Sequence, residues 1–339
     1  MSHLIDEPFF KQYGRYSVFG FYVISGYLIT RILKEVYQFD QKRFWINRAL
    51  RLYPLYLCVL LISWVAVTAL PGPAYEFAGK WGIGKTPGEI FANIIIWPLA
   101  LSIESIREST RMILPAWSIA VELQCYLALA MLTARSKIFA LATFALAVCW
   151  HGTVLTMKAL AHSEFTFGHI YFPLCAALLP FSIGSLLYFY KSSLTSKLIQ
   201  LRMRLDVVYC IWLLNMGLSY YTTAIFRGGE FLFFYINLVT ASILVALLID
   251  RQPNAIDKWL GDLAYPIFLS HHVVHFVVIF ALLGRSTANI LNFLISFPFV
   301  LAFSFALAKL ANDMIEPLRS KVRCKTKPMC QDPRDCSPA

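Results

Sequence analysis

Long apolar stretches alternate with short polar segments along almost the whole 339-residue chain. A helix that crosses a membrane needs about 20 mostly apolar residues. Stretches of this kind predict helices over residues 17–35, 52–70, 114–133, 138–157, 170–190, 206–225, 231–249, 264–283 and 289–311. The apolar runs are continuous and do not alternate residue by residue, so membrane-spanning strands are disfavoured. The pattern predicts an all-α protein, a polytopic integral membrane helical bundle of about nine spans.

One further apolar segment does not fit this series. Residues 89–103, "EIFANIIIWPLALSI", are shorter than a span, and Pro98 interrupts them. A proline inside a helix removes a backbone hydrogen bond and breaks or kinks the helix. We therefore expect this segment to be re-entrant or to lie at the membrane interface rather than to cross.

The basic residues indicate the orientation of the chain. Of the 30 Lys and Arg residues, 21 fall in segments on the same side as the loop from Arg31 to Arg51, and nine fall on the other side. Cytoplasmic loops carry the excess of Lys and Arg. The distribution predicts a multi-pass protein of the cell inner (plasma) membrane, with its N-terminus outside and its C-terminus in the cytoplasm.

The amino-acid composition further limits the class of protein and its expected partners. Only 14% of the residues are charged, whereas soluble domains carry about a quarter. The net charge of +11 is spread over alternate loops, so membrane lipid is an expected partner and nucleic acid is not. Five of the eight cysteines lie in apolar spans, and the other three lack the close pairing of a zinc site. We expect one membrane domain over residues 1–318, a basic, disordered cytoplasmic tail over 319–339, and no metal.

Two arginines stand at the edge of an apolar run in the stretch "FWINRALRLYPLY", residues 44–56. Arg48 and Arg51 are three residues apart, so on a helix they share a face and can bind the same anionic group. The alternative is that they only anchor the helix on its cytoplasmic side. Chemistry alone leaves both interpretations open.

Glu122 lies inside an apolar span, where a carboxylate costs about 3 kcal/mol or more unless it is paired or neutralised. It is therefore a candidate functional residue; the alternative is a Glu near the outer interface, bonded to a neighbouring helix.

His271 and His275 are four residues apart on one helix face. A metal would need further ligands, so histidines bonded to backbone or water are the alternative there.

Four blocks of this sequence, in the same order, resemble the membrane-bound acyltransferase-3 family. "FGFYVISGYLIT" resembles the family's G-V-x-x-F-F-x-x-S-G-F-L-I-T block, and the arginine stretch resembles F-x-x-R-x-x-R-I-x-P-x-Y. "WSIAVELQCY" resembles W-S-L-S-V-E-x-x-F-Y, with Cys125 in place of Phe. "AYPIFLSH" resembles S-Y-x-x-Y-L-x-H. Glu316 and Pro317 also resemble the family's closing E-x-P element, although here the two residues are adjacent.

The resemblance implies an O-acyltransferase, an enzyme that transfers groups other than amino-acyl groups. Its co-substrate would be acyl-coenzyme A, with acetyl-coenzyme A expected, and its acceptor a hydroxyl of a cell-envelope carbohydrate, a lipid-linked sugar or a glycosylated metabolite. By resemblance, the catalytic residues are His3, Glu122 and His271. The residues expected to bind the donor are Lys34, Arg43, Arg48, Arg51 and Tyr56, and those expected to bind substrate are Ser25, Trp117 and Tyr265.

The chain departs from the family pattern at its start. Members usually have ten spans, begin in the cytoplasm, and carry an Arg about ten residues before a catalytic His in the first helix. Here His3 stands where that His would fall, and the Arg partner is missing. We therefore expect a late start or a truncation that removes the first helix; the alternative is that this member works differently.

Two other functions remain open. Intramembrane Glu and His residues with basic inner loops also suit a proton-coupled transporter or a lipid-linked sugar carrier. Transporters usually contain related halves, and none is evident here. An inactive, truncated acyltransferase is the second alternative.

Overall fold

The computed structural model of the chain describes residues 8–103, 109–160, 166–225, 229–284 and 289–324. In this part of the chain the regular structure is helical, and one isolated β-bridge joins Trp81 to Arg111. The helices are α1 (Pro8–Glu35), α2 (Gln41–Ala69), α3 (Pro71–Phe77), α4 (Pro87–Ile95), η2 (Trp97–Ala100), α6 (Ala116–Ala128), η3 (Leu129–Thr133), α7 (Lys137–Ala159), α8 (Gly168–Tyr171), α9 (Leu174–Phe189), α10 (Lys191–Gln200), α11 (Leu205–Ile225), α12 (Gly229–Leu248), α13 (Ala255–Leu283), α14 (Ile290–Leu310), η4 (Ala311–Ile315) and α15 (Glu316–Cys324).

The prediction of a polytopic helical membrane bundle is confirmed, because each of the nine predicted segments falls on a helix. Among the described residues, seven helices are long and apolar enough to cross a membrane, or eight if α9 and α10 form one span. The number falls below nine because α10 turns by 86° away from the short α9, and the apolar part of α11, Leu205–Ser219, is shorter than a span.

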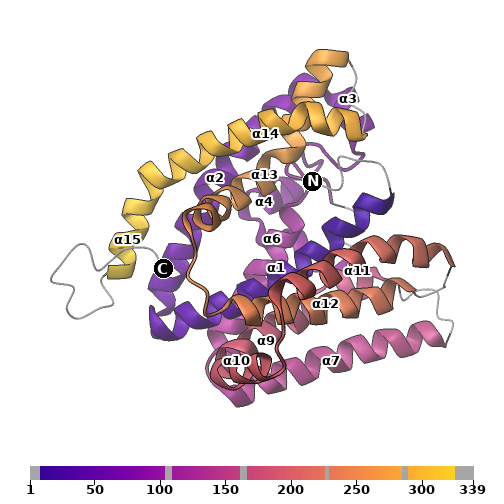
Figure 1. The fold of residues 1–339 in the computed structure, drawn as a ribbon. Helices are drawn as coiled ribbons and strands as arrows, with labels where there is room; N and C mark the ends of the chain where they lie inside the picture. The colour runs from indigo at the N-terminus through magenta and orange to yellow at the C-terminus, as the bar shows by residue number, and fades with distance from the viewer. Residues whose placement is uncertain (1–7, 104–108, 161–165, 226–228, 285–288, 325–339) are drawn as a thin grey trace.

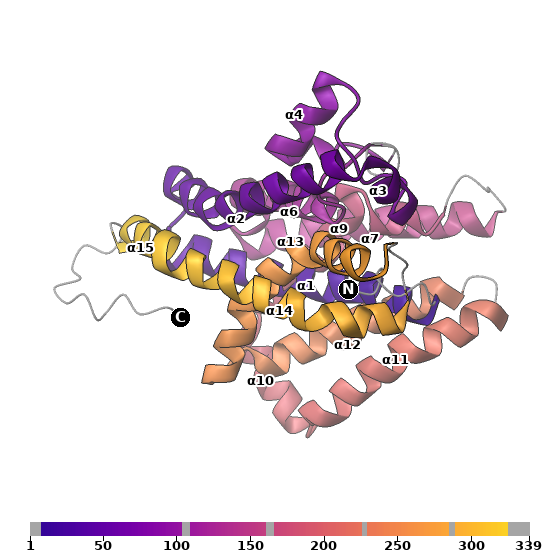
Figure 2. The ribbon, with the colours of Figure 1, turned by 90° about the horizontal axis from the view of Figure 1, so that it is seen from above.

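Helix α1 runs through the middle of the bundle and contacts α6, α9, α11 and α12. In Figures 1 and 2, α2 and α6 lie on one side of it and α11 and α12 on the other. Its contact with α9 is unusually close: a Cβ atom added to Gly26 would lie 2.2 Å from the Phe181 carbonyl oxygen, and one added to Gly184 would lie 2.2 Å from the Val23 carbonyl oxygen. Small residues at such crossings let helix backbones approach in membranes.

The segment predicted to be re-entrant returns along α2. The hydroxyl groups of Tyr53 and Tyr56 donate to the carbonyls of Ile95 and Asn93, each at 2.6 Å. Tyr53 lies 16 residues before Ala69, the end of α2, so the chain comes back roughly 24 Å along that helix at 1.5 Å per residue. This geometry favours the re-entrant interpretation over an interfacial one.

The C-terminal part of the described chain is one long helical segment. Helix α14 continues through the π-helical turn η4 into α15, which ends at Cys324 and packs against α2. Residues 319–324, the start of the predicted disordered tail, are therefore helical. Residues 325–339 lie outside the described part of the chain, and for them the tail stays a prediction.

Candidate functional site

The carboxylate of Glu122 is the centre of a buried polar cluster. Its side chain on α6 is 5% exposed. The Oε1 atom accepts hydrogen bonds from the Ser25 hydroxyl of α1, at 3.1 Å, and from the Tyr126 hydroxyl one helical turn further along α6. The second oxygen, Oε2, has no hydrogen-bond partner among the described residues. One side of the carboxylate is thus held in place while the other remains available to a ligand.

The first sequence block builds one wall of this cluster through three neighbouring features of α1. Ser25 bonds Glu122, Gly26 allows the close approach of α9, and the Thr30 hydroxyl donates to Ser185 of α9 at 2.9 Å. Ser25 therefore fixes α1 against α6, and Gly26 and Thr30 fix it against α9.

Arg48 and Arg51 lie close enough to Glu122 to interact with it electrostatically. Arg51 is exposed, whereas Arg48 is only 6% exposed and its guanidinium carbon lies 5.9 Å from the centre of the Phe44 ring. Within the described ranges, Arg48 Nε has no hydrogen-bond partner, and neither arginine has a carboxylate within ion-pair distance. The predicted pair is therefore present, with Arg48 buried and without an ion-pair partner among the described residues.

Tyr56 of α2 and Tyr265 of α13 complete the cluster. The Tyr265 hydroxyl donates to the Leu52 carbonyl at 2.9 Å, and this hydroxyl interacts electrostatically with Glu122, Tyr56 and Arg51. Four helices, α1, α2, α6 and α13, thus bring together six of the residues that the sequence pointed to: Ser25, Arg48, Arg51, Tyr56, Glu122 and Tyr265.

The other predicted residues engage different partners. Trp117 packs on Tyr171 and Phe172, with ring centres 5.4 and 5.0 Å apart. His271 is buried on α13, and its Nδ1 donates to the carbonyls of Ile267 and Phe268 at 3.0 and 2.9 Å, in its own helix. His271 thus shows the backbone bond considered as an alternative, whereas Nδ1 of His275 lies 2.7 Å from the Ser296 hydroxyl oxygen. His3 lies outside the described residues.

Lys34 and Arg43, predicted to assist the arginine pair, also have local partners. Lys34 Nζ lies over the rings of Phe39 and Phe189, at 5.9 and 5.2 Å from their centres. Arg43 Nε pairs with Asp40 at 3.3 Å, next to the start of α2, where Asp40 is the N-cap. Both side chains are tied to the ends of α1 and α2, and neither is brought to Glu122 by a described contact.

Sequence reasoning missed one residue of the site and one contact of α6. Tyr126 follows Glu122 by four residues, the spacing that places two side chains on one helix face. Gln124 donates from its Nε2 to the Ala100 carbonyl at 3.0 Å, which places the end of η2 at the level of Glu122. Irregular backbone at membrane depth is tolerated where it is buried in protein or lines a polar cavity. The re-entrant segment therefore packs against α6 at the depth of Glu122, but on a different face of that helix, because side chains two residues apart do not share a helix face.

The donor set of this cluster is oxygen-rich and cationic: one carboxylate, two guanidiniums and several hydroxyls. No group of three His, Cys, Asp or Glu side chains within the described ranges is placed to hold a metal ion. Guanidinium groups bind phosphate and carboxylate with paired, planar donors. A carboxylate beside them can accept a proton from a hydroxyl.

Comparisons with known proteins give one match. The acyltransferase-3 family, described as an acyltransferase domain, matches residues 3–309 of the chain. No curated protein matches the chain, and no solved structure matches it.

Proposed function

The chain belongs to the acyltransferase-3 family, and from that premise we propose that it is a multi-pass membrane O-acyltransferase whose donor is acyl-coenzyme A, with acetyl as the acyl group. The acceptor we propose is a hydroxyl of a cell-envelope carbohydrate, a lipid-linked sugar or a glycosylated metabolite. The membrane would be the inner (plasma) membrane, with the donor entering from the cytoplasm, on the side that carries most of the Lys and Arg residues.

The observation that carries this proposal is the buried guanidinium of Arg48, which has no carboxylate within ion-pair distance among the described residues. A buried charge without a partner costs several kcal/mol, and such a cost inside a membrane protein indicates a functional role by default. Arg51 shares its helix face, and Glu122 lies nearby. An anionic ligand at the two arginines would supply the missing charge. A phosphate group fits best, because Arg binds it through two parallel hydrogen bonds.

The reaction assigns a role to each group. The acceptor oxygen attacks the carbonyl carbon of the thioester, the carbon–sulfur bond breaks, and an ester and free coenzyme A form. The proton of the hydroxyl leaves as the new bond forms, and it finally resides on the coenzyme A thiol. By resemblance His3 would take this proton, and it lies outside the described residues. Among the described residues, Oε2 of Glu122 is the group that we assign to the first proton transfer, because Ser25 and Tyr126 already occupy Oε1 and hold the carboxylate in place.

The test is acyl transfer by membranes that contain the full chain, measured with radiolabelled acetyl-coenzyme A. Replacing Arg48 with alanine is expected to abolish transfer into the envelope carbohydrate while the protein stays in the membrane. The matched control is Arg31→Ala, which removes an exposed arginine of α1 that pairs with Glu35 at 3.0 Å. Full activity of the Arg48 variant would overturn the donor site. A purified protein that binds no coenzyme A would point instead to a carrier.

A further inference from the structure

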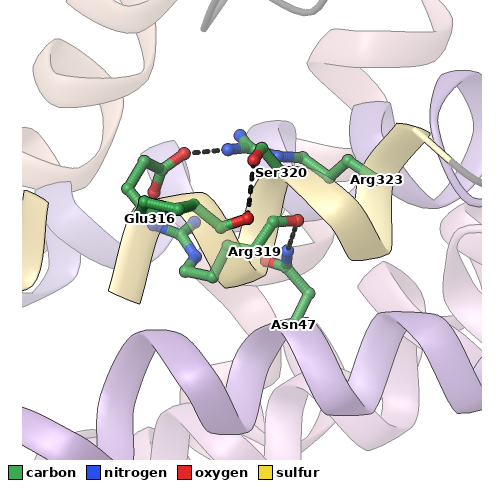
Figure 3. Close-up of polar contacts among 6 residues, drawn as sticks. Asn47, Glu316, Arg319, Ser320 and Arg323 are labelled. Atoms are coloured by element: carbon green, nitrogen blue, oxygen red, sulfur yellow. Dashed lines mark hydrogen bonds and ion pairs between the residues drawn. The ribbon is translucent and has the colours of Figure 1, made fainter. Parts of the chain in front are cut away.

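Helix α15 packs against the N-terminal half of α2, and from the sequence only Glu316 and Pro317 of this helix were noted, by resemblance. The Asn47 side chain donates from its Nδ2 to the Arg319 backbone carbonyl at 3.2 Å. Figure 3 shows this bond below α15, with the side chains of Glu316 and Arg323 meeting above it. Asn47 precedes Arg48 directly, so α15 is attached next to the proposed donor site.

A single carboxylate holds two arginines on α15. Nη1 of Arg319 lies 2.5 Å from Oε2 of Glu316, and Nη2 of Arg323 bonds to the other oxygen, Oε1. The three side chains are 16% (Arg319), 30% (Arg323) and 31% (Glu316) exposed. Both oxygens of the carboxylate are thus used, and the group stands at the surface, where a solute can reach it.

These arginines belong to the same electrostatic environment as the first pair. Arg319 interacts with Arg48 and Arg51, and the hydroxyl of Tyr37 interacts with Arg48, Arg319 and Arg323. Four guanidiniums therefore gather where α15 packs against α2, near Tyr37 in the turn between α1 and α2. Arg48 Nε and Arg319 Nε are buried and have no hydrogen-bond partner among the residues that the structure describes.

We propose that Arg319 and Arg323 bind a phosphate group of the acyl-coenzyme A donor, and that Glu316 occupies them until the donor displaces it. This inference rests on the proposed function. Like charges packed this closely repel one another, and a multiply charged anion relieves the repulsion at all four. Glu316 then acts as an internal competitor for the second arginine pair.

The order of groups along the donor matches the order of groups in the protein. In coenzyme A the thioester is followed by the pantetheine arm, then by the diphosphate, and then by the 3′-phosphate of the adenosine. In the protein, Arg48 interacts electrostatically with Glu122 and with Arg319, so the pair of Arg48 and Arg51 links the carboxylate to the arginines of α15. We therefore assign the 3′-phosphate to Arg319 and Arg323.

The experiment titrates the purified full chain, in detergent, with coenzyme A and with dephospho-coenzyme A, which lacks the 3′-phosphate. Arg323→Gln is expected to weaken coenzyme A binding about tenfold, as for the loss of a charge-assisted hydrogen bond, and to remove the preference over dephospho-coenzyme A. Glu316→Gln is expected to tighten coenzyme A binding about two- to fivefold, the contribution of an exposed ion pair. Asp313→Asn is the matched control, because it removes the same charge from an exposed position one turn earlier.

Three results would overturn the role of α15 alone. Glu316→Gln could leave coenzyme A binding unchanged or weaken it, or Arg323→Gln could keep the full preference for coenzyme A. If binding still depended on Arg48 in either case, the proposed function would survive and only the role of α15 would fall. A wild-type chain that binds no coenzyme A would overturn both. Thermal unfolding without ligand checks that each variant folds. If Glu316→Gln does not fold, the inference is tested by the binding of coenzyme A and dephospho-coenzyme A to Arg323→Gln.

Discussion

Replacing Gly26 with alanine tests the helix contact that positions Ser25 against Glu122. The added Cβ atom would lie 2.2 Å from the Phe181 carbonyl oxygen of α9 and 2.9 Å from the Cα and carbonyl carbon of the same residue. An unstrained contact needs at least about 3 Å, so α1 and α9 must separate by roughly 1 Å or distort locally. The contact is between backbones, and no flexible side chain can move aside.

The expected cost follows from these contacts. Overpacking a tight contact costs about 1–3 kcal/mol. Separation also stretches the bonds from Ser25 to Glu122 and from Thr30 to Ser185, each worth about 0.6 kcal/mol in a membrane protein. Alanine returns up to about 1 kcal/mol through its higher helix propensity. The net loss is about 1–3 kcal/mol, which for a large domain corresponds to a fall in Tm of about 2–10 °C.

Thermal unfolding of the purified protein in detergent measures this loss. The matched control is Gly20→Ala on the same helix, where the nearest atom to the added Cβ is Ala241 Cβ, at an ordinary 3.7 Å. Both variants gain the same helix propensity, so the difference between their Tm values isolates the contact with α9. Equal Tm values for the two variants would refute the reasoning.

Three further substitutions test other parts of the structure. Ser25→Ala removes one of the two donors to Glu122, so acyl transfer should fall while coenzyme A binding is kept; unchanged transfer would remove Ser25 from the site. Tyr56→Phe leaves the Asn93 carbonyl without its donor, which should cost about 1 kcal/mol and increase proteolysis within residues 86–101; equal protection would argue against the re-entrant attachment. Asn254→Ala removes the capping box of α13, which should cost about 1 kcal/mol and speed hydrogen exchange in the first turn of that helix, and an unchanged exchange rate would contradict this.

The helical content could be predicted from the sequence, because spans of apolar residues cannot satisfy their backbone polar groups in lipid by other means. The residues at which the helices start could not be predicted from it. Helix α2 begins at Gln41 and α13 at Ala255, each well before the predicted apolar window, because polar turns capped by Asp40 and Asn254 continue the helices beyond it. The bend between α9 and α10 could not be predicted either, because the length of an apolar stretch does not show where a helix bends.

Some parts of the candidate site could likewise be predicted from the sequence, and others could not. The arginine stretch, Glu122, Ser25 and Tyr265 could be predicted, since their motifs belong to helices whose packing brings them together. The role of α15 could not, because a basic, proline-containing segment also has the composition of a disordered tail. The usable signal was the spacing of Glu316 and Arg319, three residues apart and therefore on one helix face.

The measurement that tests the central claim most directly is coenzyme A binding to the full chain in which Arg48 and Arg51 are both replaced by lysine. Lysine keeps the charge that orients a helix in the membrane, but it lacks the planar, two-donor group that binds phosphate. The account predicts a Kd for coenzyme A that is about tenfold higher or more, with membrane insertion unchanged and with Arg31→Lys behaving as the wild type. A double-lysine variant that binds coenzyme A as tightly as the wild type would contradict it.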